Sequence, residues 1–386
     1  MSRPAPPERV LERIREGLFI VAHPLALTRD LKIDFWRQRA LTRYYIASGA
    51  DGIAIGVHTT QFAVHRDFER MLKPLLEDTL NTIRECEKSI GSEIVRIAGV
   101  VGTTEQAVRE AKLAWDLGYH AGLLSLHMLK GFSEERILEH IRQVSREIPI
   151  FGFYLQPAVG GLQLGYKFWR RFAEEIENLV AIKIAPFNRY YTIEVVRAVI
   201  DAGREDVALY TGNDDNIIND LLTSFRFKRR DRETVETEIV GGLLGQWAVW
   251  TRRFVEIYRF IKRIKREKRD IPRELLILNT HVTDANKAIF DVDHGFRGSI
   301  AGVLEVLRRS GFLEEVRILD PEESLSPGQI EEIDRVYQAY PHLRDDEFVS
   351  KYINSWFNEK CVGLDTLREI SIEDIRRMIS FETSHQ

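Results

Sequence analysis

Short apolar runs alternate with longer amphipathic segments along the first two thirds of this chain, and this alternation constrains the fold more than any other feature. The runs recur at intervals of about thirty residues, the length of one strand–helix–strand unit. Repeated units of this kind predict a parallel sheet, and eight of them favour a closed (β/α)8 barrel, or TIM barrel, over an open sheet. No Gly-x-Gly-x-x-Gly follows the first run, which argues against a dinucleotide-binding sheet. The eight predicted strands are Leu18–Ala22, Gly52–Gly56, Ile94–Val101, Ala121–Leu126, Pro149–Leu155, Val180–Ala185, Val207–Tyr210 and Ile239–Leu244.

The last third of the chain has helical spacing only. A (β/α)8 barrel uses about 250 residues, and this chain has 386. We therefore predict a barrel over residues 1–249 and a C-terminal helical region, residues 250–386, packed on it. The segment Phe225–Thr237 interrupts the rhythm before the eighth strand. Helices are predicted within Trp250–Arg269, Asp284–Arg309, Ser326–Tyr340, Phe348–Phe357 and Ile372–Ile379.

Composition excludes several classes of function. A net charge of −4 gives no general affinity for nucleic acid or an anionic membrane, and the basic end of Trp250–Arg269 is interpreted as a solvated helix face. No apolar run has the length of a membrane span or of a signal-peptide core. Cys86 and Cys361 lie far apart, without metal-ligand spacing. We therefore expect a cytoplasmic protein with no disulfide and no structural zinc.

One predicted strand carries a lysine in its middle. Leu179–Pro186 reads LVAIKIAP, and strand alternation places Lys183 on one face with Ala181 and Ala185. Burying an ammonium without a partner is costly, so such an amine tends to become neutral and nucleophilic, as a Schiff-base lysine is. The alternative is a structural lysine that reaches solvent or pairs with a carboxylate.

Other candidate site residues lie at the carboxyl ends of the strands, where barrel enzymes place their chemistry. Tyr154, on the strand beside that of Lys183, is expected to approach the amine as a proton shuttle, with a core tyrosine as the alternative. His58 and His127 are interpreted as acid–base or substrate-binding groups, or as structural residues. Gly212 and Asn213 are expected to shape the pocket rim, and Asp214 with Asp215 to cap a helix. The candidates for substrate binding are His58, Thr59, Thr60, His127, Gly212 and Asn213.

Four motifs, in order, resemble the dihydrodipicolinate synthase and N-acetylneuraminate lyase family. They are GADGIAIGVHTTQ over Gly49–Gln61, IAGVVG over Ile97–Gly102, FYLQP over Phe153–Pro157 and AIKIA over Ala181–Ala185. The resemblance runs from Leu18 to Leu244 and extends through the helices to about Leu343. It implies a class I aldolase-type barrel, usually a dimer or tetramer.

The resemblance also implies site roles. In such a barrel Lys183 forms an imine with a 2-oxo acid such as pyruvate, and Tyr154 relays protons. The loop after the second strand is implied to bind the substrate carboxylate through backbone amides and a hydroxyl.

Three departures argue against dihydrodipicolinate synthase itself. The family's Gly-Thr-Thr-Gly-Glu loop is replaced by VHTTQ over Val57–Gln61, and its paired tyrosines by His127 and Met128. The arginine that holds the second substrate's carboxylate is replaced by Val159, which removes a charge-assisted contact worth roughly 1.5–3 kcal/mol. We therefore expect a different second substrate.

The sequence predicts a lyase acting on a 2-oxo acid, of aldolase or dehydratase type. The alternative is a barrel that has lost catalysis and serves in binding or assembly. The cluster His281, Asp284, Asp291, Asp293 and His294 has ligand types that Mn or Zn would accept, but its spacing matches neither an EF-hand nor a zinc-binding helix. Neither a metal nor a cofactor is predicted.

Overall fold

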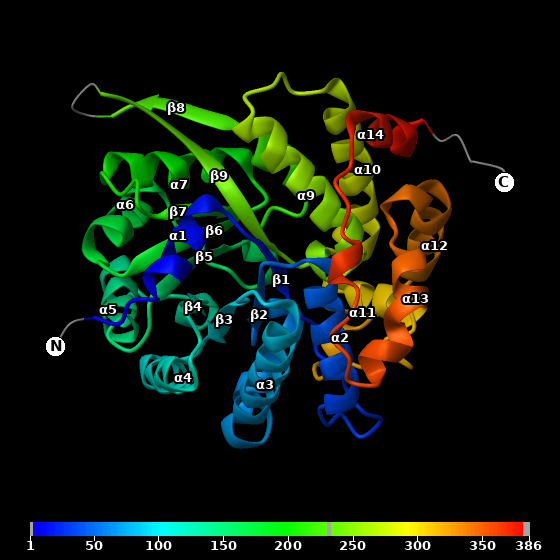
Figure 1. Ribbon diagram of the computed structural model, residues 1–386. Helices are drawn as coiled ribbons and strands as arrows, with labels where there is room; N and C mark the ends of the chain where they lie inside the picture. Colours follow the sequence, from blue (N-terminus) through cyan, green and yellow to red (C-terminus); the bar gives the residue numbers. More distant parts are fainter. Residues whose placement is uncertain (1–2, 230–232, 381–386) are drawn as a thin grey trace.

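Eight parallel strands form a closed barrel in the computed structural model, which describes residues 3–229 and 233–380. The strands follow their sequence order around the ring, and the first pairs with the last through Phe19 and Gly242. The predicted (β/α)8 barrel with a C-terminal helical region is confirmed (Figure 1). The barrel strands are β1 Phe19–Ala22, β2 Gly52–Ile55, β3 Val95–Val100, β4 Ala121–Leu124, β5 Ile150–Leu155, β6 Leu179–Ala185, β7 Ala208–Thr211 and β9 Thr234–Leu244.

Helices connect these strands on the outside of the ring. The first of them shows the local signals clearly: the Asp34 carboxylate accepts the Arg37 N–H at its start, and Gly49 ends it with a φ of 96°. The connecting helices are α2 Phe35–Ser48, α3 Lys73–Ile90, α4 Thr104–Leu117, α5 Glu134–Val144, α6 Tyr166–Glu175, α7 Arg189–Asp201 and α8 Ile217–Leu222.

The interruption predicted at Phe225–Thr237 contains two antiparallel strand segments, and residues 230–232 within it lie outside the described residues. Strand β8, Ser224–Lys228, pairs antiparallel with the first residues of β9, from Thr234 to Glu238. The last barrel strand is therefore longer than predicted, and its first residues, which pair with β8, project beyond the ring (Figure 1).

Two apolar clusters lie on either side of the strands. The inner cluster fills the barrel and contains Ala181 and Ala185 of β6, whereas the outer cluster, under the helices, contains Ile182 and Ile184. Helix α1, Glu8–Glu16, closes one end of the barrel with its buried Ile14, whose carbonyl oxygen accepts the Tyr210 hydroxyl at 2.7 Å. The chemistry must therefore lie at the opposite end.

The C-terminal helices pack against the barrel near α2 (Figure 1). Tyr44 of α2 anchors them, because its hydroxyl donates to the Asp345 carboxylate at 2.7 Å and accepts the Thr251 N–H at 2.8 Å. These helices are α9 Thr251–Arg266, α10 Arg273–Ile289, α11 Ser299–Arg309, α12 Gln329–Ala339, α13 Asp346–Phe357 and α14 Ile372–Ile379.

The prediction of no disulfide is wrong. Cys86 of α3 and Cys361, after α13, are bonded, with their Cα atoms 5.3 Å apart. Their sequence separation of 275 gave no spacing signal, because it is the packing of α13 on α2, next to α3, that brings the cysteines together. The cysteines therefore no longer support a reducing compartment.

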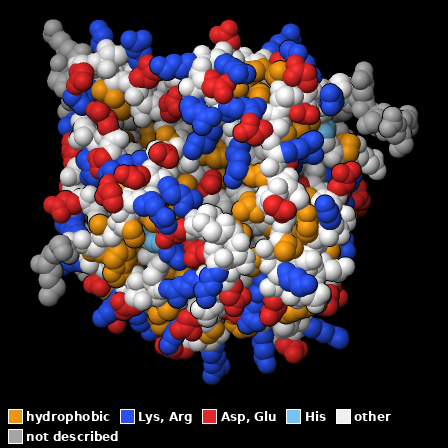
Figure 2. All heavy atoms as spheres, in the orientation of Figure 1, with side chains coloured by type: hydrophobic (Ala, Val, Ile, Leu, Met, Phe, Trp, Pro, Cys, Tyr) orange, Lys and Arg blue, Asp and Glu red, His pale blue; other side chains and the backbone are white. Residues whose placement is uncertain are grey.

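The surface carries both signs of charge. Figure 2 shows lysine and arginine interspersed with aspartate and glutamate over the face that it presents. No helix in the described ranges is long and apolar enough to cross a membrane.

Candidate active site

Lys183 lies inside the barrel, at the end where the strands terminate. Its side chain is only 7% exposed, and its amine lies 4.5 Å from the centre of the Phe153 ring on the neighbouring strand. Burial lowers the pKa of this amine from 10.5 to about 8, although the negative charge of Asp214 acts in the opposite direction. The predicted buried amine, on the alanine face of β6, is therefore present.

A small cavity surrounds the amine, and we call it the lysine cavity. Its volume is about 50 Å³. A cavity needs at least about 10–15 Å³ to hold one water molecule, so there is room for a small ligand beside the amine. Its polar lining includes Lys183, His58, Thr59, Gln156 and Asp214.

Asp214 is the ionisable partner that sequence analysis missed. It is 8% exposed, and its Oδ1 accepts the Gln246 N–H at 3.1 Å. Burial raises the pKa of this carboxyl to about 7, and the positive charge of Lys183 opposes that rise. The prediction that Asp214 caps the following helix is wrong, because α8 begins after Asn216. The sequence indicated a site role for Asp214 only through its position, one residue after Asn213 of the predicted pocket rim.

Gly212 allows the amine to lie where it does. A Cβ at this position would come within 2.5 Å of Lys183 Cε and 2.8 Å of Ala185 Cβ. The predicted close backbone approach is therefore observed. Asn213, by contrast, is absent from the lining of the lysine cavity: its Oδ1 accepts the Phe187 N–H at 3.1 Å, and its Nδ2 donates to Asp220 at 2.9 Å.

Tyr154 does not lie beside the amine, so the predicted geometry is wrong. Strand register places Phe153 opposite Lys183 and Tyr154 opposite Ile184, and the tyrosine belongs to the outer cluster. Its ring packs against Trp169 of α6, 5.0 Å between centroids, and burial raises its pKa to about 12. The rings of Phe151 and Phe153, not that of the tyrosine, face the barrel interior.

The loop after β2 is held by two threonine hydroxyls. Thr60 is fully buried and its Oγ1 accepts the N–H groups of Gly56 and Val57, while Thr59 Oγ1 donates to the Ala22 carbonyl oxygen at 2.8 Å. These two hydroxyls therefore shape the loop. Among the described residues, no carbonyl or side chain accepts the backbone N–H of His58 or Thr59, and both residues line the lysine cavity.

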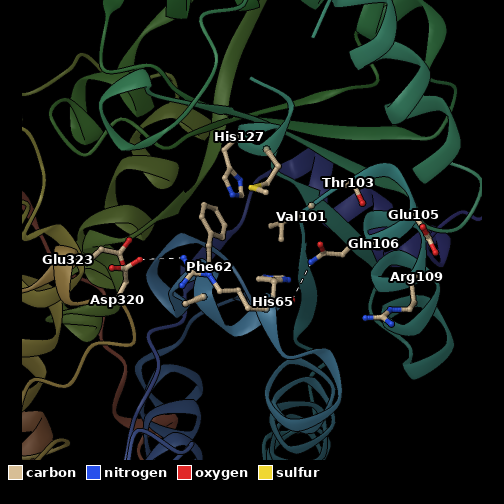
Figure 3. A pocket seen from close by; sticks show the side chains of 14 residues that line it. Phe62, His65, Val101, Thr103, Glu105, Gln106, Arg109, His127, Asp320 and Glu323 are labelled. Carbon is tan, nitrogen blue, oxygen red and sulfur yellow. Dashed lines mark hydrogen bonds and ion pairs between the residues drawn. The ribbon is translucent and has the colours of Figure 1, made fainter. Parts of the chain in front are cut away.

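The two candidate histidines, His58 and His127, line different cavities. His58 lines the lysine cavity, and burial, with the nearby positive charge of Lys183, lowers its pKa to about 4, so the ring is neutral at pH 7. His127 stacks on Phe62, 4.5 Å between ring centroids, and lines a different pocket of about 500 Å³ (Figure 3). Its Nδ1 lies 2.9 Å from Ser125 Oγ. The structure therefore brings His58 to the amine and leaves His127 outside.

The C-terminal region closes the lysine cavity. Phe290, Phe296 and Ser299, from the end of α10 to the start of α11, complete its lining with Phe187 of the β6–α7 loop. Val159 also lines it, so the position where the resemblance implies an arginine is apolar.

The acidic and histidine cluster of the C-terminal region is dispersed. Asp284 lies within α10 and pairs with Arg335 at 2.7 Å, and His294 Nδ1 lies 2.6 Å from Asp291. Within the described ranges, no group of three or more His, Cys, Asp or Glu side chains is arranged to hold a metal ion.

Comparison with known proteins identifies relatives of this barrel. Residues 18–224, more than half of the chain, match the Dihydrodipicolinate synthetase family. The 4-hydroxy-tetrahydrodipicolinate synthase of Aromatoleum aromaticum is 28% identical over 200 residues, 50% of this chain and 63% of that protein. A probable 5-dehydro-4-deoxyglucarate dehydratase of Acinetobacter baumannii is 34% identical over 87 residues, 22% of this chain and 28% of that protein. The chain thus spans less than two thirds of the length of these relatives.

A solved structure shares the fold. YagE, a prophage protein of the dihydrodipicolinic acid synthase family from E. coli K12, solved in complex with pyruvate, superposes with a TM-score of 0.66. It is 15% identical, and the match covers 83% of this chain and 97% of that one. At this identity the likeness establishes the barrel alone.

Proposed function

Because this chain belongs to the dihydrodipicolinate synthetase family, we propose that it is a lyase that forms an imine between Lys183 and a small 2-oxo acid. The observation that carries the proposal is the buried Lys183 amine, whose pKa is lowered to about 8, in a cavity shared with Asp214. A buried amine has a large neutral fraction near neutral pH, and the neutral form is the nucleophile. A barrel used only for binding or assembly needs no such amine.

The first step is addition of Lys183 Nζ to the C2 carbonyl of the 2-oxo acid. The carbinolamine must then lose its hydroxyl as water, which requires one proton. Asp214 supplies that proton in the proposal, because its carboxyl, with a pKa of about 7, is present in both protonation states near neutral pH. The products of this step are the iminium ion, one water molecule and the Asp214 carboxylate.

The second step uses the iminium as an electron sink. The Asp214 carboxylate removes a proton from C3, giving a neutral enamine and restoring the carboxylic acid. The enamine then attacks an aldehyde, and the Asp214 carboxylic acid protonates the alkoxide that forms; the reverse of these steps cleaves a carbon–carbon bond. In the dehydratase alternative, the enamine instead expels the hydroxyl at C4, which takes the Asp214 proton and leaves as water. Hydrolysis of the final imine returns the amine, so no oxidant or reductant enters.

The substrate carboxylate has a place in the same cavity. The N–H groups of His58 and Thr59 point to no protein acceptor in the described chain, and both residues line the lysine cavity. A neutral His58 ring can donate a further hydrogen bond without bringing a competing charge. The small volume of the cavity, about 50 Å³, favours a small acid such as pyruvate at the amine.

Reductive trapping tests this proposal. The protein is incubated with pyruvate and sodium borohydride, digested, and the peptides are identified by mass spectrometry. We expect an adduct on the peptide that bears Lys183, none in Lys183→Met, and an unchanged adduct in Lys130→Met, which alters an exposed lysine outside the cavity. Absence of the adduct across a panel of 2-oxo acids would contradict the proposal.

A further inference from the structure

A second cavity adjoins the lysine cavity, and we call it the outer cavity. It has a volume of about 620 Å³ and lies between the loop after β7 and helix α10. The two cavities share Asp214 and the rings of Phe187, Phe290 and Phe296. A substrate longer than a three-carbon acid, once joined to Lys183, therefore has the outer cavity as its adjoining space.

The charges of the outer cavity favour no anion. Asp284 is held by Arg335 at 2.7 Å and also accepts the Tyr340 hydroxyl, and Lys287 is paired with Asp293 at 2.6 Å. Its other two ionisable lining residues are Asp214 and Asp215, neither of which forms a salt bridge with a described residue. A carboxylate on the ligand would thus meet acidic groups and no unpaired lysine or arginine of the described lining.

A buried acceptor in the same lining lacks a donor. Asn286 is 3% exposed, and its Nδ2 donates to the Asp214 carbonyl oxygen at 2.7 Å. This bond fixes the amide orientation, because a carbonyl can only accept. Asn286 Oδ1 then remains without a hydrogen-bond partner among the described residues. Because this oxygen has almost no surface open to the cavity, Asn286 acts there by holding the loop that carries Asp214, not by accepting from a ligand.

We propose that the outer cavity binds the distal part of the substrate and selects a chain that presents hydroxyl or amine donors over one that ends in a carboxylate. The groups that receive this chain are the carboxylates of Asp214 and Asp215, which offer acceptors. This inference rests on the proposed function for its chemistry, since the distal part is the aldehyde that the enamine of Lys183 attacks. The apolar Val159 already argued against a substrate carboxylate at its position, and the outer cavity supports the same conclusion with different residues.

Three four-carbon aldehydes test the selection. The protein is incubated with pyruvate and either D-erythrose, which is uncharged and rich in hydroxyls, succinic semialdehyde, which ends in a carboxylate, or butanal, which has neither. Products are quantified by mass spectrometry. We expect kcat/KM for erythrose to exceed that for each of the other two by at least about tenfold, the effect of one good hydrogen bond. An equal or higher value for succinic semialdehyde would overturn the proposal.

A charge reversal sharpens this test. In Asp215→Lys we expect the ratio of erythrose to succinic semialdehyde turnover to fall by at least about tenfold, because the lining gains a cation for the carboxylate. Asp270→Lys, in the exposed segment between α9 and α10 and outside the cavity lining, is the matched control and should keep the ratio. The same change in both variants, or no change in Asp215→Lys, would contradict a role for the outer cavity.

Binding without chemistry separates this inference from the proposed function. Saturation-transfer NMR is recorded with erythritol and with succinate, on the unmodified protein and on Asp215→Lys. Erythritol should give the stronger signal on the unmodified protein, and succinate should gain in the variant. If pyruvate trapping fails while this pattern holds, only the imine chemistry is wrong. If trapping succeeds and succinate binds the unmodified protein better, the assigned ligand class is wrong.

Discussion

Replacing Lys183 with methionine removes a buried amine and keeps a chain of similar length, so the variant should be more stable than the natural protein at neutral pH. The pKa of Lys183 falls from 10.5 to about 8 on folding. Below pH 8 the folded state therefore holds an ammonium that it disfavours, and this cost disappears as the pH rises from 8 to 10.5. The stability of the natural protein therefore rises with pH over this range, because Lys183 binds its proton more weakly in the folded state than in the unfolded state.

The size of the effect follows from the shift. A change of one pKa unit corresponds to about 1.36 kcal/mol. The two pKa values give a cost of about 3 kcal/mol at pH 7 and about 1.4 kcal/mol at pH 9.5. The advantage of Lys183→Met should shrink by about 2 kcal/mol over this interval. Asp214 acts in the same direction, because its pKa rises further once the lysine charge is lost.

Urea unfolding at the two pH values measures this difference. The free energy of unfolding is determined for the natural protein, Lys183→Met and the exposed control Lys130→Met. The control should show no pH-dependent difference from the natural protein. If the gap between Lys183→Met and the natural protein is the same at both pH values, Lys183 titrates normally and the reasoning fails.

Three further predictions concern the site and the fold. Asp214→Asn should lower kcat by about 10²–10⁴-fold and remove the ionisation near pH 7 from the pH–rate profile. Tyr154→Phe should change kcat less than about twofold, because this tyrosine belongs to the outer cluster. A larger loss of kcat in Tyr154→Phe than in Asp214→Asn would reject the assigned proton relay. Gly212→Ala should slow borohydride trapping at least about tenfold, because the added Cβ would overpack against the Lys183 side chain. Gly165→Ala should not slow it, because the nearest atom to a Cβ there is 3.9 Å away. Equal trapping rates in these two variants would contradict the close approach of Gly212 to the Lys183 side chain. Cys361→Ser should lower the free energy of unfolding by about 2–4 kcal/mol, measured in urea without reductant, and an unchanged value would mean that the disulfide does not form.

The barrel and its lysine could be predicted because each rests on a local pattern. Eight apolar runs at a regular interval leave few architectures, and the alanines beside Lys183 mark the crowded inner face of β6. Gly212 followed from its place after the seventh strand.

Tyr154 shows where local pattern ends. Alternation states which residues of β5 share a face, but not which face lies inward, and the argument from neighbouring strands placed the tyrosine on the wrong side. The structure shows the reason: Phe151 and Phe153 fill the barrel interior, while Trp169 of α6 packs against the tyrosine ring.

Long-range packing was beyond the sequence patterns. The Cys86–Cys361 bond and the closure of the lysine cavity by Phe290 and Phe296 both depend on how the C-terminal helices pack on the barrel. Asp214 was assigned to a helix cap because an acidic residue before a helix commonly serves there. Its burial beside the amine appears only in three dimensions.

A crystal structure of the protein soaked with pyruvate tests the central claim most directly. The account predicts continuous density from Lys183 Nζ to C2 of the ligand, with the ligand carboxylate at the N–H groups of His58 and Thr59 and the Asp214 carboxyl within hydrogen-bonding reach of the new bond. Pyruvate bound elsewhere, or a free Lys183 amine beside an empty lysine cavity at saturating pyruvate, would contradict it.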